Sequence, residues 1–259
     1  MEKQRKIEIE FLGTGTSQGV PVVACNCRVC QSTNNKDKRL RSSVYVKVYN
    51  AHILIDAGPD FRQQMLRSDI RLLDAILITH EHADHIFGLD DIRAFNWIQS
   101  KPMDIYVEER VQKSIKRVFD YVFAKFRYPG IPEMDLHIIK NETFFVHEIP
   151  VIPIRGLHHK LPVFGFRIGT FAYITDMKTI EKEELEKLKG LDILVLNALR
   201  QEEHISHFNL KEALELIKQL MPQRAYLTHI SHQMGFYEEV MKLLPENVSL
   251  AYDGLKLSI

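Results

Sequence analysis

Three predicted strands of this chain end in the same way, and the repeated ending constrains the fold strongly. Each of the segments ILITH, AYITD and AYLTH is an apolar run followed by threonine and a metal-binding side chain, namely His80, Asp176 or His229. In α/β proteins, the chemistry gathers at the carboxyl ends of the strands. Three such endings therefore indicate that several strands meet at one site.

Apolar runs rich in Ile, Val and Tyr alternate with segments of helical periodicity, which predicts a layered α/β chain. The 110–135 stretch carries many aromatic and basic residues, and we interpret it as a helical insertion that lines or covers the site, with an ordinary amphipathic helix as the alternative. We expect strands at 6–13, 43–49, 52–58, 74–80, 104–109, 147–154, 163–169, 171–176, 192–198, 224–229 and 249–254, and helices at 60–68, 85–98, 110–126, 179–189, 209–221 and 234–244.

The composition narrows the choice of partners and compartment. Lys+Arg and Asp+Glu number 34 each, so the neutral chain does not favour a nucleic-acid or anionic-membrane partner. The N-terminus lacks the long apolar core of a signal peptide, and no later segment approaches a membrane span, so we expect a cytoplasmic protein. In that compartment the three cysteines of CNCRVC (25–30) are expected to bind metal as thiolates rather than to form disulfides; free thiols are the alternative.

The segment THEHADHIFGLDD (79–91) contains the pattern H-x-H-x-D-H, formed by His80, His82, Asp84 and His85. Imidazole and carboxylate groups suit divalent ions such as Zn, Mn and Fe. His80 and His82 are two residues apart at a strand end, so both can point to one ion. Asp84 and His85 follow a tight turn and can bind a second ion nearby. The alternative is a polar helix cap with incidental histidines.

This pattern is typical of the metallo-β-lactamase superfamily, and the chain resembles the PhnP branch of phosphodiesterases nearly end to end. Ribonuclease Z is a more distant relative with a similar metal core. The resemblance implies a four-layer αββα sandwich in one domain, 1–259, whose pseudo-equivalent halves, about 1–145 and 146–259, meet at a dinuclear metal site. The resemblance rests on GTGTSQGVP (13–21), CNCRVC, RLRSS (39–43), LIDAGPDFR (54–62), HADHIFGLDD, LPVFGFRIG with FAYITD (161–176), SHFNLKEAL (206–214) and AYLTHISH (225–232).

The resemblance also implies a set of metal ligands. In GLHHKLPV, His158 matches the family ligand and His159 takes the position of the usual glycine, so either histidine remains a candidate. The two ions, Mn or Zn, would share a bridging Asp176 and a hydroxide. The implied ligands are His80, His82, His158 and Asp176 for one ion, and Asp84, His85, His229 and Asp176 for the other.

Further residues are expected to support the site. Asp56 and Asp253 are candidates to accept a ring N–H from a ligand histidine, or else to form turns. The resemblance supplies the fourth ligand of the cysteine cluster as His232, completing a structural zinc site with Cys25, Cys27 and Cys30.

The resulting functional hypothesis is a dinuclear metal-dependent phosphodiesterase that uses the bridging hydroxide as nucleophile. We assign catalysis to Asp84, as a metal ligand, and to His207, as the acid that protonates the leaving group; His204 is the weaker candidate for that acid. The expected substrate is a small or cyclic phosphate ester such as 5-phosphoribosyl 1,2-cyclic phosphate, and a homodimer is common for such folds. Rival hypotheses are an RNA-processing nuclease like ribonuclease Z, a hydrolase of lactones, thioesters or β-lactams, and a non-enzymatic binding protein.

Overall fold

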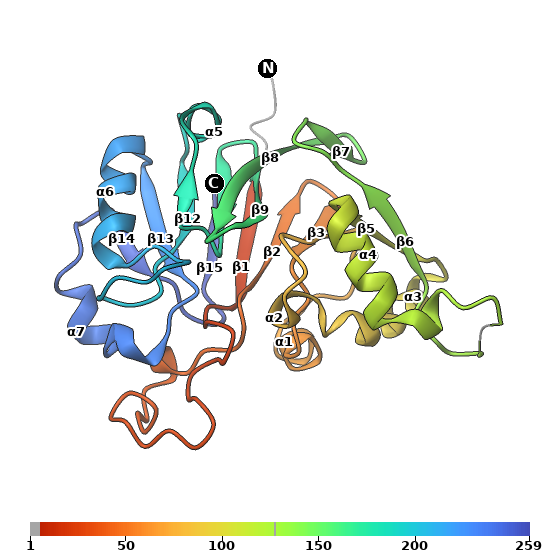
Figure 1. The fold of residues 1–259 in the computed structure, drawn as a ribbon, viewed down its shortest axis with the longest axis horizontal. Helices are drawn as coiled ribbons and strands as arrows, with labels where there is room; N and C mark the ends of the chain where they lie inside the picture. The colour runs from red at the N-terminus through yellow and green to blue at the C-terminus, as the bar shows by residue number, and fades with distance from the viewer. Residues whose placement is uncertain (1–5, 127) are drawn as a thin grey trace.

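The computed structural model describes residues 6–126 and 128–259, and two β-sheets lie face to face at its centre (Figure 1). In the first sheet β1, β2 and β3 are antiparallel, whereas β3, β4, β5 and β6 are parallel. Its strands, in order, are β15 (Lys256–Ser258), β1 (Ile7–Gly13), β2 (Ser43–Val48), β3 (Ala51–Ile55), β4 (Ala75–Leu77), β5 (Met103–Val107) and β6 (Met134–Ile138).

The second sheet repeats this plan. Here β8, β9 and β10 are antiparallel, and β10, β12, β13 and β14 are parallel. The strands, in order, are β11 (Thr179–Ile180), β8 (Ile149–His158), β9 (Leu161–Ile168), β10 (Phe171–Ile174), β12 (Ile193–Asn197), β13 (Arg224–Thr228) and β14 (Val248–Leu250), with β7 (Phe144–Val146) paired to β8.

Helices cover the outer face of each sheet, which confirms the predicted four-layer αββα sandwich (Figure 1). One apolar core fills the space between the sheets, and two others lie between a sheet and its helices. The helices are α1 (Phe61–Arg67), α2 (Ala83–Ile86), α3 (Arg93–Gln99) and α4 (Glu109–Val118) on the first sheet, α5 (Lys182–Glu186), α6 (Leu210–Leu220) and α7 (Tyr237–Met241) on the second, and the short η1 (Asn35–Asp37), η2 (Leu89–Ile92), η3 (Asp120–Val122) and η4 (His232–Met234).

The last strand of the chain belongs to the first sheet rather than the second. The expected boundary near residue 145 falls inside β7, which pairs with β8 of the second sheet. The last strand, β15, crosses back and pairs with β1 of the first sheet. The pairing of β15 with β1 therefore ties the end of the second half to the first sheet.

The expected strands all appear, and four short ones, β6, β7, β11 and β15, were not expected from the sequence. The interpretation of 110–135 as a helical insertion is wrong for α4, because α4 is the crossover between the parallel strands β5 and β6. Residue 127 of that stretch lies outside the described residues. Among the described residues, no helix combines the length and apolar character needed to cross a bilayer.

Candidate metal centre

The backbone at several strand ends turns side chains towards the seam between the two halves. Asp56 follows β3, and Asp176 occupies the corresponding place after β10, the first strand of the parallel run in the second sheet. Asp56, Asp176 and His229 have φ values of 62°, 57° and 57°. This left-handed conformation is unfavourable for residues other than glycine, and such residues cluster at functional sites.

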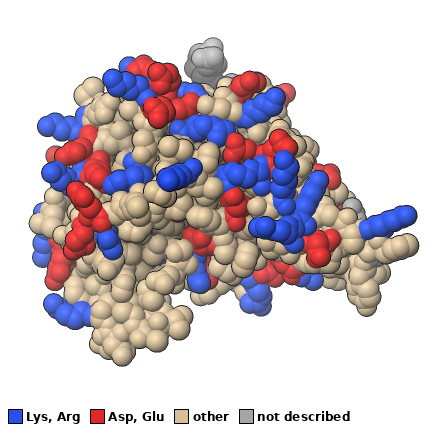
Figure 2. Space-filling model, viewed as in Figure 1, with Lys and Arg blue, Asp and Glu red and all other residues tan. Residues whose placement is uncertain are grey.

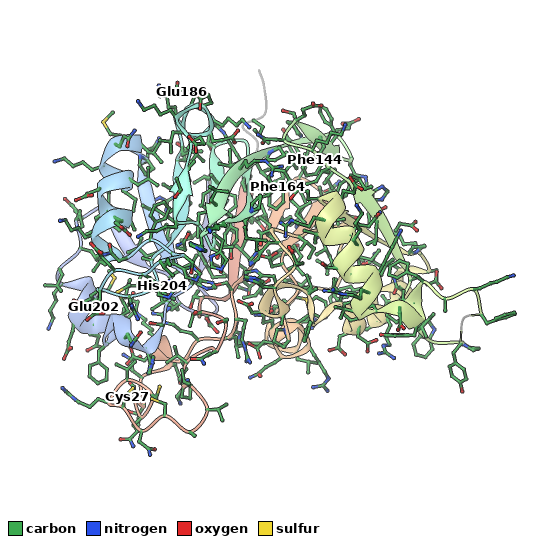
Figure 3. The ribbon with its side chains drawn as sticks, in the orientation of Figure 1. Cys27, Phe144, Phe164, Glu186, Glu202 and His204 are labelled. Atoms are coloured by element: carbon green, nitrogen blue, oxygen red, sulfur yellow. The ribbon has the colours of Figure 1, made fainter. Side chains whose placement is uncertain are left out.

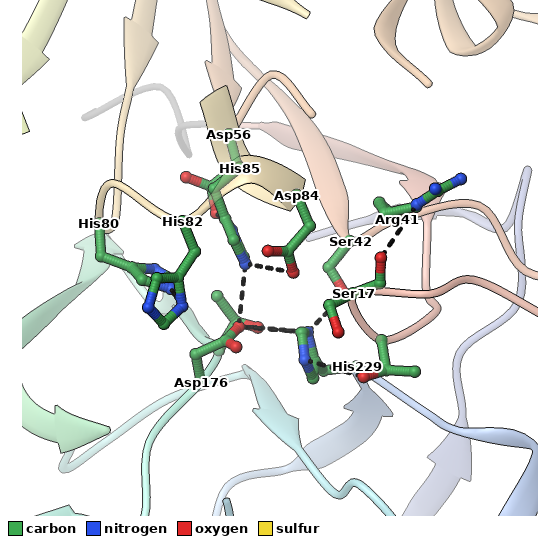
Figure 4. Close-up of polar contacts among 12 residues, drawn as sticks. Ser17, Arg41, Ser42, Asp56, His80, His82, Asp84, His85, Asp176 and His229 are labelled. Atoms are coloured by element: carbon green, nitrogen blue, oxygen red, sulfur yellow. Dashed lines mark hydrogen bonds and ion pairs between the residues drawn. The ribbon is translucent and has the colours of Figure 1, made fainter. Parts of the chain in front are cut away.

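One tight cluster joins the two halves of the chain (Figure 4). A ligand atom from each of Asp84, His85, Asp176 and His229 lies within 4.8 Å of the others. His85 Nε2 lies 3.1 Å from Asp84 Oδ2 and 3.3 Å from Asp176 Oδ2, and His229 Nδ1 lies 3.1 Å from Asp176 Oδ2. Asp176 is therefore in contact with the histidines of both halves.

A second cluster lies on the other side of Asp176. Ligand atoms of His158, Asp176 and His207 are within 4.8 Å of one another. The rings of His82 and His158 are 5.2 Å apart, and His80 Nε2 is 3.0 Å from His82 Nδ1. Asp176 belongs to both clusters, whereas His80 and His82 lie outside the two sets and border them through ring contacts with His158. His207, which we expected to act as an acid, lies among the candidate ligands, next to His158 and Asp176.

Two hydrogen bonds fix which nitrogen faces each cluster. His85 Nδ1 donates to Asp56 Oδ2 at 2.7 Å, and His158 Nδ1 donates to the Ser206 carbonyl at 2.9 Å. Because carboxylates and carbonyls only accept, both Nδ1 atoms carry a proton, and Nε2 is the nitrogen of each ring that faces a cluster. Thr79 completes the arrangement, since its backbone N–H and its hydroxyl both donate to Asp56.

Burial and charge set the protonation of the cluster. Burial lowers the pKa of His229, lowers that of His80 well below its usual value, and lowers that of His207 to about 3, so these rings are neutral near pH 7. Burial opposes ionisation of Asp176, but His229 and His85 outweigh it and hold the pKa of that carboxyl well below its usual range. Neutral imidazoles and ionised carboxylates are the forms that bind metals.

The residues fit a divalent cation. His85 Nε2 is fully buried and makes no hydrogen bond to any described residue, although two carboxylate oxygens lie beside it. Without a cation the carboxylates can only recruit a proton, and they raise the pKa of His85 well above its usual value despite its burial. A divalent ion would satisfy the lone pair and both carboxylates at once.

The structure distinguishes between His158 and His159. His158 joins the cluster, whereas His159 is exposed and has a φ of 55°. The left-handed backbone explains why glycine suits position 159, since glycine adopts it without steric cost. His204 lies beyond His207, with the two ring centroids 5.2 Å apart, and its Nδ1 accepts from the Ser206 backbone N–H.

Asp56 and Asp253, both candidates to hold a ligand histidine, have different contacts. Asp56 contacts His85, as expected. The prediction that Asp253 accepts a ring N–H from a histidine is wrong. Asp253 accepts instead from the Thr14 hydroxyl and the Leu40 backbone N–H, both at 2.8 Å, so it anchors loops. Those loops carry the GTGTSQGVP and RLRSS motifs, whose contacts the sequence did not predict.

Side chains of these two loops reach His229. Ser42 Oγ lies 3.3 Å from its Nδ1 and Thr16 Oγ1 lies 3.3 Å from its Nε2. The fully buried Arg39 donates to Thr14 and to the Ala251 carbonyl, which ties the loops to the second sheet. The RLRSS and GTGTSQG motifs contain these residues, but their positions in the sequence do not predict which side chains they contact.

The three cysteines and His232 form a separate cluster around Cys27 (Figure 3). The thiols of Cys25, Cys27 and Cys30 lie 3.4, 3.2 and 3.4 Å from His232 Nδ1. In a tetrahedral zinc site, bonds of about 2.3 Å to sulfur and 2.0 Å to nitrogen place these atoms about 3.5 Å apart. The cluster therefore has the dimensions of a closed Cys₃His site.

A family model described as the β-lactamase superfamily domain matches residues 51–230, more than half of the chain. This chain belongs to the metallo-β-lactamase superfamily. The crystal structure of a diphosphatase from the PhnP family superposes with a TM-score of 0.92 at 38% identity, covering 98% of this chain and 97% of that one. Membership of the superfamily implies divalent metal ions and, with this neighbour, supports a hydrolase.

Other superfamily relatives carry different names. The octanoyltransferase of Porphyromonas gingivalis is 43% identical over 252 residues, which are 96% of this chain and 51% of that protein. A ribonuclease Z of Nostoc punctiforme is 28% identical over 72% of this chain and 52% of its own length. The chain thus spans about half the length of these curated relatives. Human tRNase Z, short form, shares the fold at 21% identity, with a TM-score of 0.70 over 96% of this chain and 98% of that one.

Proposed function

We propose that this chain is a dinuclear metal-dependent phosphodiesterase that hydrolyses small phosphate esters, including cyclic ones such as 5-phosphoribosyl 1,2-cyclic phosphate. The observation that carries the proposal is the position of Asp176, whose carboxylate belongs to two ligand clusters at once. The 38% identity with a PhnP-family diphosphatase over nearly the whole chain supports phosphorus chemistry.

Two Mn or Zn ions would be held by the ligand sets expected from the sequence, and a structural zinc by the cysteine cluster. When bound, a pair of divalent ions supplies a nucleophile from water near neutral pH and neutralises charge on phosphoryl oxygens. The ligands proposed are His80, His82, His158 and Asp176, which rest on the family resemblance, then Asp84, His85, His229 and Asp176, and finally Cys25, Cys27, Cys30 and His232, which are two of the clusters in the structure.

The chain's own groups would orient these ligands and handle the leaving group. Asp56 and the Ser206 carbonyl hold His85 and His158 with their Nε2 atoms facing the clusters. His207 is nearly buried, and its Nδ1 has no hydrogen-bond partner in the described chain while lying 3.8 Å from Asp176 Oδ1. We assign it the protonation of the departing oxygen. Because its ring is neutral near pH 7, it would first take up the proton that the attacking water releases. The competing role for this side chain is that of a ligand.

The substrate class is a small molecule rather than RNA. Lys, Arg, Asp and Glu are interspersed over the face shown in Figure 2, and the net charge is zero. Tracking an RNA backbone requires a basic surface. The name octanoyltransferase does not transfer to this chain, since the chain spans only 51% of that protein. Hydrolysis of acyl esters is nevertheless the second candidate, because the same site chemistry can attack acyl carbons.

We further place this activity in the cytoplasm, where closely spaced cysteines persist as metal thiolates. A homodimer of this chain remains our expectation for its assembly in solution. Gel filtration with light scattering would test that expectation directly.

The test is hydrolysis of bis(p-nitrophenyl) phosphate by chelator-stripped protein refilled with Mn²⁺ or Zn²⁺. We expect metal-dependent release of nitrophenolate that Asp84→Ala abolishes, and Glu184→Gln serves as a buried carboxylate control that spares the ligands. Folded, metal-loaded protein that cleaves p-nitrophenyl acetate or a lactone but no phosphodiester would refute the proposal in favour of acyl-ester hydrolysis. Cleavage of a tRNA precursor with a steep salt dependence would instead indicate a nuclease.

A further inference from the structure

We propose that Arg110 is a positioning residue that locks the metal-binding loop of the first half onto the β8–β9 hairpin of the second half. The inference rests on the proposed function, because it assigns Arg110 a role in setting the distance between ligand histidines. It also explains what the start of α4 does beside the site.

The contacts of Arg110 reach both halves. Its guanidinium forms an ion pair with Glu81, the residue between His80 and His82. Arg110 Nη2 also donates to the Pro162 carbonyl at 2.5 Å. In the β8–β9 hairpin, Pro162 pairs with Leu157, the neighbour of His158. Arg110 therefore contacts Glu81, which adjoins two proposed ligands of the first half, and Pro162, whose cross-strand partner Leu157 adjoins His158 in the second half.

Arg110 belongs to a row of alternating charges that continues into the second sheet. Glu108 Oε2 lies 3.5 Å from Arg110 Nη2, and Glu108 Oε1 accepts from Arg155 Nη2 at 2.8 Å. Arg155, on β8, lies over the Phe164 ring with its guanidinium carbon 4.3 Å from the ring centroid. The row therefore connects the loop after β4, the start of α4 and the β8–β9 hairpin.

Partial burial increases the effect expected from losing the ion pair between Arg110 and Glu81. The side chains of Arg110 and Glu81 are 31% and 19% exposed, so both charges have lost much of their hydration. Glu81 Oε2 is buried and has no hydrogen-bond partner among the described residues. Loss of Arg110 would leave that carboxylate half desolvated and unpaired, which favours movement of the loop towards water.

The movement would act on the ligands. His82 and His158 come from opposite halves, and their ring centroids are 5.2 Å apart. Residues that orient metal ligands from outside typically contribute about 10- to 100-fold to metal affinity or activity. Lysine cannot replace Arg110 fully, because a single ammonium does not reproduce the planar fork that reaches Glu81 and Pro162 together.

The experiment measures metal affinity of folded, apo-reconstituted protein by competition with a chromogenic chelator, without substrate. We expect Arg110→Ala to weaken binding of one of the two catalytic ions by about 10- to 100-fold, and Arg110→Lys to give an intermediate loss. Lys187→Ala is the matched control. Lys187 is 28% exposed and also bridges a carboxylate, Glu184, and a proline carbonyl, Pro153, without contacting a proposed ligand.

A merely structural role predicts that Arg110→Ala and Lys187→Ala lower the melting temperature alike and leave metal affinity unchanged; that result overturns the proposal. Glu81→Gln provides a second check, because its effect on affinity and that of Arg110→Ala should not add if both act through one contact. If Arg110→Ala does not fold, Arg110→Lys with wild-type affinity overturns the proposal equally. Since no substrate is present, an error in the proposed phosphodiesterase activity leaves this measurement unaffected.

Discussion

Replacement of Asp56 by asparagine tests whether the hydrogen bond between His85 and Asp56 prepares His85 to bind a metal ion. The Asp56 carboxylate is completely buried, and its Oδ2 accepts from His85 Nδ1 at 2.7 Å and from the Thr79 hydroxyl at 2.9 Å. Asparagine keeps the shape and can still accept the Thr79 backbone N–H through Oδ1. Its NH₂ group, however, would face the His85 Nδ1–H, which places two donors against each other.

The least costly escape is a change of tautomer. His85 would move its proton to Nε2, the nitrogen that lies 3.1 Å from Asp84 and 3.3 Å from Asp176. In the wild type, an ion that displaces the Nε2 proton leaves the Nδ1–H donating to Asp56. In the variant, displacing the Nε2 proton forces the Nδ1–H against the asparagine NH₂ group, so metal binding costs more. We expect a loss of about 10- to 100-fold in affinity for one ion, equivalent to about 1.4 to 2.7 kcal/mol.

The assay is a competition titration of chelator-stripped protein with Zn²⁺ or Mn²⁺, followed by elemental analysis of the bound metal. Glu184→Gln is the matched control, since it also removes a buried carboxylate but one that Asn141 and Lys187 hold, away from the proposed ligands. That control should lose stability and keep its metal affinity. Wild-type affinity in folded Asp56→Asn would refute the tautomer argument.

Three further predictions follow from the same geometry. His207→Ala should lower turnover of alkyl phosphodiesters by about 10²- to 10⁴-fold with full metal content, whereas nitrophenyl esters lose less because their leaving group barely needs a proton; loss of a metal ion would instead identify His207 as a ligand. His232→Ala should remove one zinc per chain, measured by elemental analysis, while the dinuclear site still fills, and full metal content would contradict the Cys₃His assignment. Because burial lowers the pKa of His207 from 6.5 to about 3, the unfolded chain binds the extra proton between these values. The stability of the apoprotein should therefore fall as pH drops from about 6.5 towards 3, with a smaller fall in His207→Gln, measured by urea denaturation; equal slopes would contradict that assignment.

The repeated plan of the two sheets accounts for much of what could be predicted. Each sheet has three antiparallel strands followed by parallel ones, and the first parallel strand of each is followed by an aspartate with a left-handed backbone, Asp56 or Asp176. The strand endings exposed this repetition in the sequence because the apolar run and the polar residue after it are local features. The short strands β6, β7, β11 and β15 escaped notice because most of their side chains are not buried, so they lack the apolar face that marks a strand.

The sequence by itself determined the element types, the αββα architecture through family resemblance, and the residues that gather at the seam. Local hydrophobic periodicity and closely spaced motifs encode these features within a few neighbouring positions. The choice of His158 over His159 was not local, since it required the left-handed turn that points one ring inward and the other outward.

Only the tertiary structure decided how the site is held. The separate roles of Asp56 and Asp253, the approach of Ser42 to His229, and the bridge from Arg110 to Glu81 and Pro162 all join residues between 23 and 239 positions apart in the chain. Such contacts depend on the packing of two sheets and on the loops between them. Their physical basis is the need of buried charges for partners, which a linear pattern of residues does not record.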